Sequence, residues 1–327
     1  MFNIFFEPDY ALRKKNFFNL QLLNSQVLNY YIKFLFNLNL SINKNFIING
    51  PLMRMNNSII LSRKDKRISV NKIKYRYSYI LQFDDFGERV LKKILKKNEA
   101  DTKIVIGPFY TIDQLKNLQR YVNKYPFIKF VISSRNSFEP INSEFNLNIK
   151  PNQLFELPGG VLEEKFIYKG NQLNRNNKCL IYFKNRSSED LELVKNFLKS
   201  KNISYELLEY GKFKNKSLLE KGKNFKFAIV LTTAESQGYG VQELMSQNIP
   251  LLVWDISENI YENKVIKGTS VPFWDKSCGI KVNSFDELSN NFIKFCKNLD
   301  AFYPAEYFRN NLTIENELKN IKQYFKI

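Results

Sequence analysis

The sequence contains no histidine among its 327 residues. This absence excludes the Ser-His-Asp triad, the Cys-His dyad and the HExxH zinc site, because each of these sites needs an imidazole. It also excludes general acid–base catalysis by histidine near neutral pH. Any chemistry that the chain performs must therefore use carboxylates, lysine, arginine, hydroxyl groups or backbone amides.

Cysteine is scarce as well, with three residues in all: Cys179, Cys278 and Cys296. Their odd number and the lack of CxxC spacing indicate neither a disulfide framework nor a zinc site. The N-terminus carries Glu7 and Asp9 and no cleavable apolar core, unlike a signal peptide. The most apolar long stretch, at 27–40, is too short and too interrupted by polar residues to span a bilayer, and we expect an amphipathic or core helix there. We therefore expect a cytoplasmic protein with reduced cysteines.

Acidic residues are outnumbered, with 32 against 50 basic residues, which gives a formal net charge of +18. Two interpretations stay open: a lysine-rich coding bias, or attraction to anions such as nucleotides, anionic lipid surfaces or nucleic acid. Basic clusters stand at Arg13–Lys15, Arg63–Arg67 and Lys92–Lys97, and none is interleaved with the aromatic pattern of an RNA-recognition module. We expect no specific nucleic-acid partner, but a basic nucleic-acid-binding protein remains an alternative.

Short apolar runs alternate with helical periodicity along the whole chain. The expected strands are 46–49, 77–83, 103–107, 128–133, 179–183, 204–210, 227–232 and 250–254. The expected helices are 86–96, 111–123, 187–199, 240–248, 284–297 and 313–326. Continuous apolar runs are typical of strands covered on both faces, so the pattern predicts an α/β fold with parallel sheets.

A domain boundary is predicted near Pro158-Gly159-Gly160, where an apolar strand-like piece ends and fresh strand–helix alternation begins. The two predicted domains, 1–158 and 159–327, are each of ordinary domain size. The terminal helix is expected to pack back on the first domain. An ordinary loop inside one large sheet is the alternative.

Two acids surround a glycine turn in the stretch FAIVLTTAESQGYGVQELMSQNIPLLVWD, residues 227–255. Glu235 stands just beyond an expected buried strand, where ligands bind in doubly wound sheets. Gly238 and Gly240 allow a tight turn and a close approach to a ligand, and the helix that follows offers amides to a phosphate. We expect Glu243 in the first turn of that helix, where it could bind a hydroxyl-rich ligand or only complement the helix dipole.

The spacing of Glu235, seven residues and Glu243, followed by Met245 and Pro250, resembles the E-x7-E signature of retaining glycosyltransferases of the GT-B fold, family four type. The segment LPGGVLEEKF at 157–166 is similar to the interdomain segment of that family. The resemblance implies two Rossmann-like domains whose parallel sheets face a central cleft. It also implies metal-independent transfer of a sugar, with retention of configuration, from a nucleotide sugar to a glycan, lipid or protein-linked acceptor.

The resemblance also implies residue roles in the second domain. Glu235 would be the catalytic residue, which holds hydroxyls of the donor sugar near the reacting centre, and Glu243 would bind the ribose. Lys184 and Arg186 are the candidates for the diphosphate. The remaining donor-binding positions are Gln237, Gly238, Tyr239, Gly240 and Val241. The donor would be UDP- or GDP-linked, and no metal or other cofactor is expected.

Many members of that family place a histidine near the donor sugar, and this chain has none. A group from the first half must substitute for it, or the chain is an inactive sugar-binding protein on the same fold. The candidate acceptor-side residues lie in two loops after expected strands: Gly107, Tyr110, Ser134 and Arg135. Besides the donor and a glycan acceptor, the positive charge suggests peripheral contact with an anionic membrane surface.

Two other stretches have plainer interpretations. Asp84 and Asp85 in FDDFGE are not spaced as a D-x-D metal motif, and we interpret them as a strand end that leads into a helix. The loop TSVPFWDKSCG at 269–279 could line the cleft, but packing explains its aromatic and proline residues at least as well.

Overall fold

The structure is a computed structural model, and it describes residues 2–7, 35–36, 38, 40, 50–71, 76–97, 102–162, 178–212 and 224–327. The strand predicted at 46–49 and most of the helix predicted at 27–40 lie outside these ranges. The chain forms two compact units. The first consists of Met1–Arg135, Asn142–Gly159 and Glu317–Ile327, and the second of Asn136–Ile141 and Gly160–Asn316.

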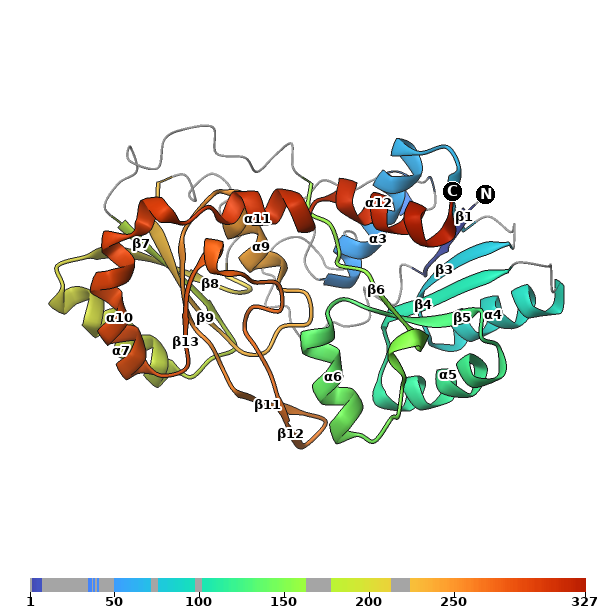
Figure 1. Ribbon diagram of the computed structural model, residues 1–327, viewed down its shortest axis with the longest axis horizontal. Coiled ribbons are helices and arrows are strands. Elements are labelled where there is room, and N and C mark those ends of the chain that lie inside the picture. Colours follow the sequence, from blue (N-terminus) through green and yellow to red (C-terminus); the bar gives the residue numbers. More distant parts are fainter. Residues whose placement is uncertain are drawn as a thin grey trace. The chain divides into compact units, whose positions relative to one another are not determined.

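The first unit is built on a six-stranded sheet with the order β2-β1-β3-β4-β5-β6, in which every neighbouring pair is parallel. Its strands are β1 (Phe2–Phe5), β2 (Ile68–Val70), β3 (Tyr77–Gln82), β4 (Lys103–Phe109), β5 (Ile128–Ile132) and β6 (Leu154–Glu156). Its helices include α3 (Gly50–Lys64), α4 (Asp85–Lys97) and α5 (Ile112–Lys124), and α6 (Arg135–Glu144) begins in it (Figure 1).

Local sequence explains these elements. Ile104, Val105 and Ile106 of β4 are all fully buried, so both faces of the strand are covered. The carboxylate of Asp84 accepts hydrogen bonds from the amides of Phe86 and Gly87, which caps the start of α4. The interpretation of this aspartate pair as a strand end leading into a helix is confirmed.

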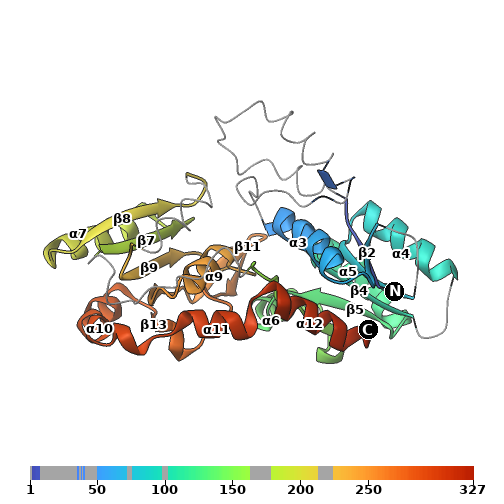
Figure 2. The same ribbon diagram turned by 90° about the horizontal axis from the view of Figure 1, so that it is seen from above.

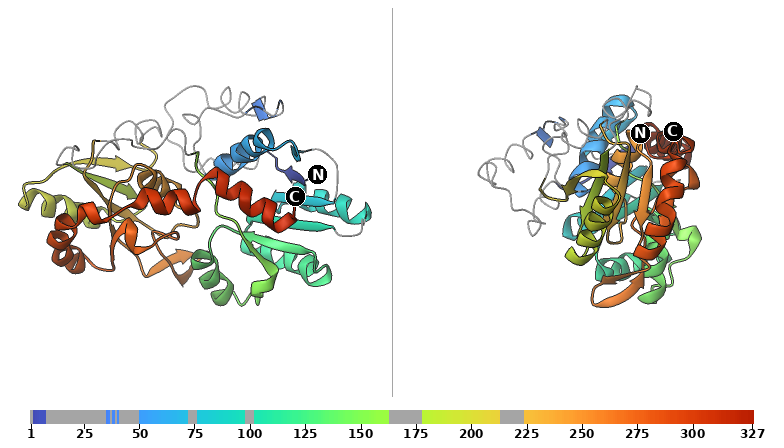
Figure 3. Two further views of the ribbon diagram at one scale, coloured as in Figure 1. Left: turned by 45° about the horizontal axis from the view of Figure 1, so that its top comes forward. Right: turned by 90° about the vertical axis from the view of Figure 1, so that its left-hand side faces the viewer.

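The last helix, α12 (Ile314–Phe325), packs within the first unit from Glu317 onward. The Glu317 carboxylate lies 2.8 Å from a guanidinium nitrogen of Arg54 and accepts from the Asn57 amide at 3.1 Å. Arg54 also donates to the backbone oxygen of Leu157. The ring centroids of Phe2 and Phe325 are 4.5 Å apart, so the two ends of the chain lie side by side (Figure 3).

A second ion cluster in the first unit surrounds Asp65, just beyond α3. Its carboxylate accepts from the Arg67 guanidinium at 2.7 Å and lies 2.7 Å from the Lys322 ammonium of α12. The hydrogen bond from Arg67, followed by the one from Lys322, holds the pKa of Asp65 well below its usual range. The charged form of Asp65 therefore stabilises the folded state.

The second unit is built on a five-stranded parallel sheet with the order β13-β10-β9-β7-β8. Its strands are β7 (Lys178–Lys184), β8 (Ser204–Glu209), β9 (Phe227–Thr232), β10 (Leu251–Trp254) and β13 (Gly279–Val282). Its helices include α7 (Ser188–Ser200), α9 (Tyr239–Ser246), α10 (Phe285–Lys297) and α11 (Pro304–Asn311). Strands β11 (Glu258–Tyr261) and β12 (Lys264–Lys267) form a separate antiparallel hairpin.

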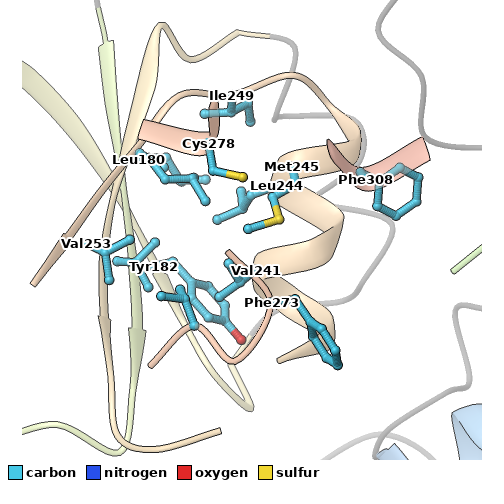
Figure 4. Packing of buried hydrophobic residues seen from close by; sticks show 14 of the residues in the cluster. Leu180, Tyr182, Val241, Leu244, Met245, Ile249, Val253, Phe273, Cys278 and Phe308 are labelled. Atoms are coloured by element: carbon cyan, nitrogen blue, oxygen red, sulfur yellow. The ribbon is translucent and has the colours of Figure 1, made fainter. Parts of the chain in front are cut away.

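Alternate residues of β9 serve two separate cores. Phe227, Ile229 and Leu231 pack with α7 and α10, whereas Ala228 and Val230 pack with α9 and α11. Figure 4 shows the second cluster, in which leucine and methionine side chains of α9 point toward strand residues. Figure 2 shows α7 and α9 on different sides of β9. A strand covered on both faces needs apolar side chains on both, which is why residues 227–231 read as one continuous apolar run.

The predicted α/β fold with parallel sheets is confirmed. The capped helix starts are present too, since Ser187 accepts from the Asp190 amide at 3.1 Å at the start of α7. The predictions did not include β1, β2, β13, the β11–β12 hairpin, α3, α6 or α11. The loop predicted at 269–279 is shorter than expected, because Lys276–Cys278 form a 3₁₀ turn and Gly279 begins β13.

Candidate functional site

The candidate site lies at the carboxyl ends of β7, β9 and β10, in the loop between β9 and α9. Gly238 caps the start of α9 with φ 67° and ψ 41°, a left-handed conformation that favours glycine. The Glu235 amide donates to the Thr269 oxygen at 3.0 Å, and the Glu235 backbone oxygen accepts from the Ser137 hydroxyl at 2.8 Å. Ser137 belongs to the part of α6 that clusters with the second unit. These bonds fix the backbone on both sides of the Glu235 side chain.

Lys184 is the nearest cationic partner of Glu235. Its ammonium lies 2.6 Å from a carboxylate oxygen of Glu235 and 4.5 Å from the centre of the Tyr210 ring. Lys184 is the last residue of β7 and pairs in register with Thr232, the last residue of β9, which brings the two loops together. The side chains of Lys184 and Glu235 are only 20% and 11% exposed. The structure therefore combines one diphosphate candidate and the candidate catalytic acid into one ion pair.

Arg186, the other diphosphate candidate, contacts the ends of two strands. Its guanidinium donates to the backbone oxygens of Thr232 at 3.3 Å and Trp254 at 3.0 Å, and to Asp190 at 2.6 Å. It also lies over the Trp254 ring, 4.8 Å from the centroid. Because Thr232, Trp254 and Asp190 belong to β9, β10 and α7, these contacts connect the three elements.

The position of Glu243 corrects the sequence interpretation. Helix α9 begins at Tyr239, so Glu243 is its fifth residue and lies in the second turn rather than the first. The side chain is buried within the second unit. Complementing the helix dipole is therefore a weaker explanation for Glu243 than the sequence suggested, because that effect falls off beyond the first turn.

Gly240 also differs from the expectation. It is the second residue of α9 and not part of the turn. A Cβ at this position would overlap the Tyr182 hydroxyl, so the glycine makes room for that side chain. Burial, and then the negative charges of Glu235 and Glu243, raise the pKa of Tyr182 well above its usual value. Tyr182 therefore stays neutral beside the two acids.

The sequence interpretation did not include Gln242, whose side chain is buried in the first turn of α9. Its amide nitrogen donates to the Gln237 backbone oxygen at 2.6 Å. In the part of the chain that the structure describes, the side-chain oxygens of Gln242 and Thr232 have no hydrogen-bond partner although both are buried. Gln237 and Val241 are buried beside them, and half-buried Tyr239 packs against the same core. No spacing rule singles out a glutamine inside a helix, so Gln242 could not be recognised from the sequence.

A second polar network connects the end of β10 to the stretch 269–270, which contacts the candidate site. Asp255, at the end of β10, accepts from the Thr269 hydroxyl at 2.9 Å and lies 3.1 Å from the Lys281 ammonium. The Ser270 hydroxyl donates to the Thr232 oxygen at 2.8 Å. The stretch 269–275 thus contacts the candidate site through its backbone and hydroxyls, while Trp274 packs against the core.

The acceptor-side candidates fall into two groups. Gly107 precedes a cis proline at φ 121°, and the Tyr110 hydroxyl donates to the Val131 oxygen, so this pair packs on β4 and β5. Ser134 is buried, and the amide of Arg135 donates to Glu156 at 3.0 Å. Ser137, whose hydroxyl donates to the Glu235 backbone oxygen, lies two positions after the candidate Arg135.

Two further findings apply to the described ranges only. They contain no group of three or more acidic or cysteine side chains arranged to hold a metal ion. Their helices include none with the length and hydropathy needed to cross a bilayer.

No protein-family model matches the sequence, and no curated protein matches it either. Similar solved structures include a glycosyltransferase from Rickettsia africae ESF-5, with 12% identity and a TM-score of 0.51 over 90% of this chain and 86% of that one. Another is TarM, an S. aureus protein, with 14% identity and a TM-score of 0.50 over 83% of this chain. This chain spans 58% of the length of TarM. At such identities the likeness shows the fold, and the predicted GT-B fold with two Rossmann-like units is confirmed.

Proposed function

We propose that the protein is a glycosyltransferase that moves a sugar from a nucleotide-sugar donor to a glycan, lipid or protein-linked acceptor. One observation carries the proposal: Glu235 lies at the carboxyl end of β9, ion-paired with Lys184, directly before a glycine-capped helix that bears Glu243. Ligands of doubly wound sheets bind beyond the carboxyl ends of parallel strands. In this proposal the second unit binds the donor, and the first unit binds the acceptor.

The chemistry requires a stabilised leaving group. A nucleoside diphosphate gains negative charge as it departs, and preorganised positive groups lower the energy of that transition state. The first amides of α9 lack intrahelical acceptors and suit a phosphate oxygen. Lys184 supplies the cation, because an ammonium has three donors and can serve Glu235 and a phosphate together. We assign the phosphate contact to Lys184 rather than Arg186, because Lys184 is paired with Glu235 whereas Nε and Nη1 of Arg186 donate to Asp190, Thr232 and Trp254.

The two acids then have separate roles. Glu235 would hold hydroxyls of the donor sugar next to the reacting carbon, whose transition state resembles an oxocarbenium ion, as in glycoside hydrolysis. Glu243 would bind the ribose of a UDP- or GDP-linked donor. Retention of configuration and independence of metal belong to the same proposal and rest on the E-x7-E resemblance. A cytoplasmic or membrane-peripheral location is proposed with them.

A binding panel followed by a turnover assay tests the proposal. Thermal melting with UDP, GDP, ADP and CMP identifies the nucleotide, because a ligand that binds only the folded state raises the melting temperature. Donor hydrolysis is then measured for wild type, Glu235→Gln and Glu192→Gln. Glu192 is an exposed glutamate of α7 and serves as the matched control. We expect a loss of about 100-fold or more in Glu235→Gln and wild-type turnover in Glu192→Gln.

Equal turnover in all three proteins would refute the assignment of Glu235. Nucleotide binding without turnover of any donor would favour the second candidate, an inactive sugar-binding protein. The absence of histidine from the sequence is the observation that supports this candidate. A third outcome is tight binding to DNA or RNA, with an affinity that falls steeply with salt and is the same in wild type and Glu235→Gln. This outcome would favour a nucleic-acid-binding protein instead.

A further inference from the structure

Helices α4 and α5 of the first unit lie side by side, and their outer faces form one surface. The Tyr121 hydroxyl of α5 donates to the Glu88 carboxylate of α4 at 2.7 Å. Helix α4 buries Gly87, Leu91 and Ile94 against its own unit. Helix α5 buries its apolar stripe in the same way. The exposed residues of both helices lie outside these buried stripes, and Figure 1 shows the two helices as neighbours.

This outer surface, which we call the α4–α5 surface, is strongly basic. Its exposed cations are Arg89, Lys92, Lys93, Lys96, Lys97, Lys116, Arg120 and Lys124. Its exposed acids are Asp85 and Asp113, both in the first turn of their helices. A third acid, Glu88, is half-buried and lies 2.9 Å from the Lys92 ammonium. Most of the cations thus face no acid on their own helices.

A lysine-rich composition alone would produce the same excess on other helices. Helices α7 and α10 of the second unit are a fair comparison, because they have 13 residues each, as do α4 and α5. Their exposed cations are Lys199, Lys294 and Lys297, and their exposed acids are Glu189, Glu192, Asp286 and Glu287. These outer faces are balanced. The basic excess of the α4–α5 surface is therefore not shared by α7 and α10.

The arrangement of the cations decides between anionic partners. On α4, residues 89, 92, 93 and 96 lie opposite the buried stripe, given 3.6 residues per turn. The two aromatic residues on these helices, Phe86 and Tyr121, are half-buried. Proteins that bind single-stranded nucleic acid use exposed aromatic rings as stacking platforms, whereas anionic headgroups require only a dense set of cations near the bilayer.

We propose that the α4–α5 surface docks the protein on a bilayer that contains anionic lipids. The contact is electrostatic, because the apolar side chains of both helices already pack inside the first unit. It should therefore be reversed by salt. The proposal does not depend on the transferase activity, since these helices belong to the first unit and Glu235 belongs to the second.

Vesicle co-sedimentation tests the proposal with the full chain. The vesicles contain phosphatidylcholine with phosphatidylserine, or phosphatidylcholine alone. Each cation near an anionic surface contributes about fivefold in affinity. Replacing Lys93, Lys96 and Arg120 together by Gln should therefore weaken binding to the mixed vesicles about 100-fold, with little binding to phosphatidylcholine alone. High salt should release the wild-type protein.

The matched control replaces Lys199, Lys294 and Lys297 by Gln, which lowers the net charge by the same amount on the balanced faces. This variant should keep wild-type affinity, and equal melting temperatures of the variants and the wild type establish that each remains folded. Equal losses in the two triple variants would overturn the proposal, because overall charge would then explain binding. No binding of the wild type to mixed vesicles at low salt would overturn it too. Tighter binding to single-stranded RNA or duplex DNA than to the vesicles would assign the surface to a polynucleotide instead.

Discussion

The ion pair between Lys184 and Glu235 makes a quantitative prediction about the second unit. Lys184→Met removes the ammonium and leaves the Glu235 carboxylate in a mostly buried place without its cation. Glu235→Gln leaves the ammonium in the same position. Removing one partner of a fully buried pair costs about 3–5 kcal/mol, and an exposed pair contributes about 0.2–1 kcal/mol. With side chains 20% and 11% exposed, each single substitution should lower the free energy of unfolding by about 2–3 kcal/mol.

The double variant distinguishes a coupled pair from two separate residues. Once one partner is gone, removing the other costs little, so the interaction energy of the cycle should be about 2 kcal/mol. The chain contains two tryptophans, Trp254 and Trp274, and both belong to the second unit. Tryptophan fluorescence during urea unfolding therefore reports the unit that holds the pair.

A second cycle provides the control. Lys195 and Glu192 of α7 are 2.7 Å apart, but Glu192 is 57% exposed. Their interaction energy should be about 0.5 kcal/mol or less. If the Lys184 and Glu235 losses added within about 0.5 kcal/mol, the two residues would not act as one electrostatic unit, and the reasoning would fail.

Three further substitutions test other contacts. Gly240→Ala would place a Cβ on the Tyr182 hydroxyl and should lower the free energy of unfolding by about 1–3 kcal/mol. Tyr182→Phe in the same background should restore part of this stability, as measured by urea unfolding. No recovery would contradict the overlap. Glu317→Gln leaves the buried Arg54 guanidinium without its carboxylate and should cost about 3–5 kcal/mol by circular dichroism, whereas a cost below about 1 kcal/mol would disprove the pairing. Asp65 has a depressed folded pKa, so Asp65→Asn should cost about 1–2 kcal/mol at neutral pH. This cost should disappear as the pH falls from the unfolded pKa of about 3.9 through the lower folded value, and a cost independent of pH would refute the assignment.

The strands that the sequence predicted best are those covered on both faces. The range predicted for β9, 227–232, is the range observed, because its first five residues each belong to one of two cores and are apolar. Helices α7, α10 and α12 were found within one residue at each end, because a capping side chain and an apolar stripe mark them. These signals lie within one segment and need no knowledge of its neighbours.

The elements that were missed depend on distant partners. Strand β2 has three residues and is defined by its pairing with β1, and β13 by its pairing with β10. The β11–β12 hairpin turns at Glu262 and Asn263, which both have positive φ, at 45° and 62°. Such turns usually carry Asn-Gly or Asp-Gly, and a glutamate at the first position gives no comparable signal.

The residues of the candidate site also fall into those that a single segment predicts and those that depend on distant partners. Spacing placed Glu235 and Gly238 correctly at a strand end and a helix start, because that reasoning uses one continuous segment. The Ser137 contact joins residues 98 positions apart, and the Lys184 contact joins two different strand ends. No local pattern encodes either contact. Arg186 had the same sequence signal as Lys184, and only the fold distinguishes a cation beside Glu235 from one that binds strand-end carbonyls.

The two acids of the motif are positioned by different parts of the fold, and this supports different roles for them. The backbone of Glu235 is tied to Thr269 and Ser137, and its side chain is tied to Lys184, so three separate elements determine where that carboxylate lies. Glu243 lies in the second turn of α9, and α9 begins at the left-handed Gly238. A carboxylate that contacts the sugar during the reaction needs such tight positioning, because small misplacements lower the catalytic rate strongly. A carboxylate that only binds a ribose needs a rigid helix, and the second turn of α9 provides one.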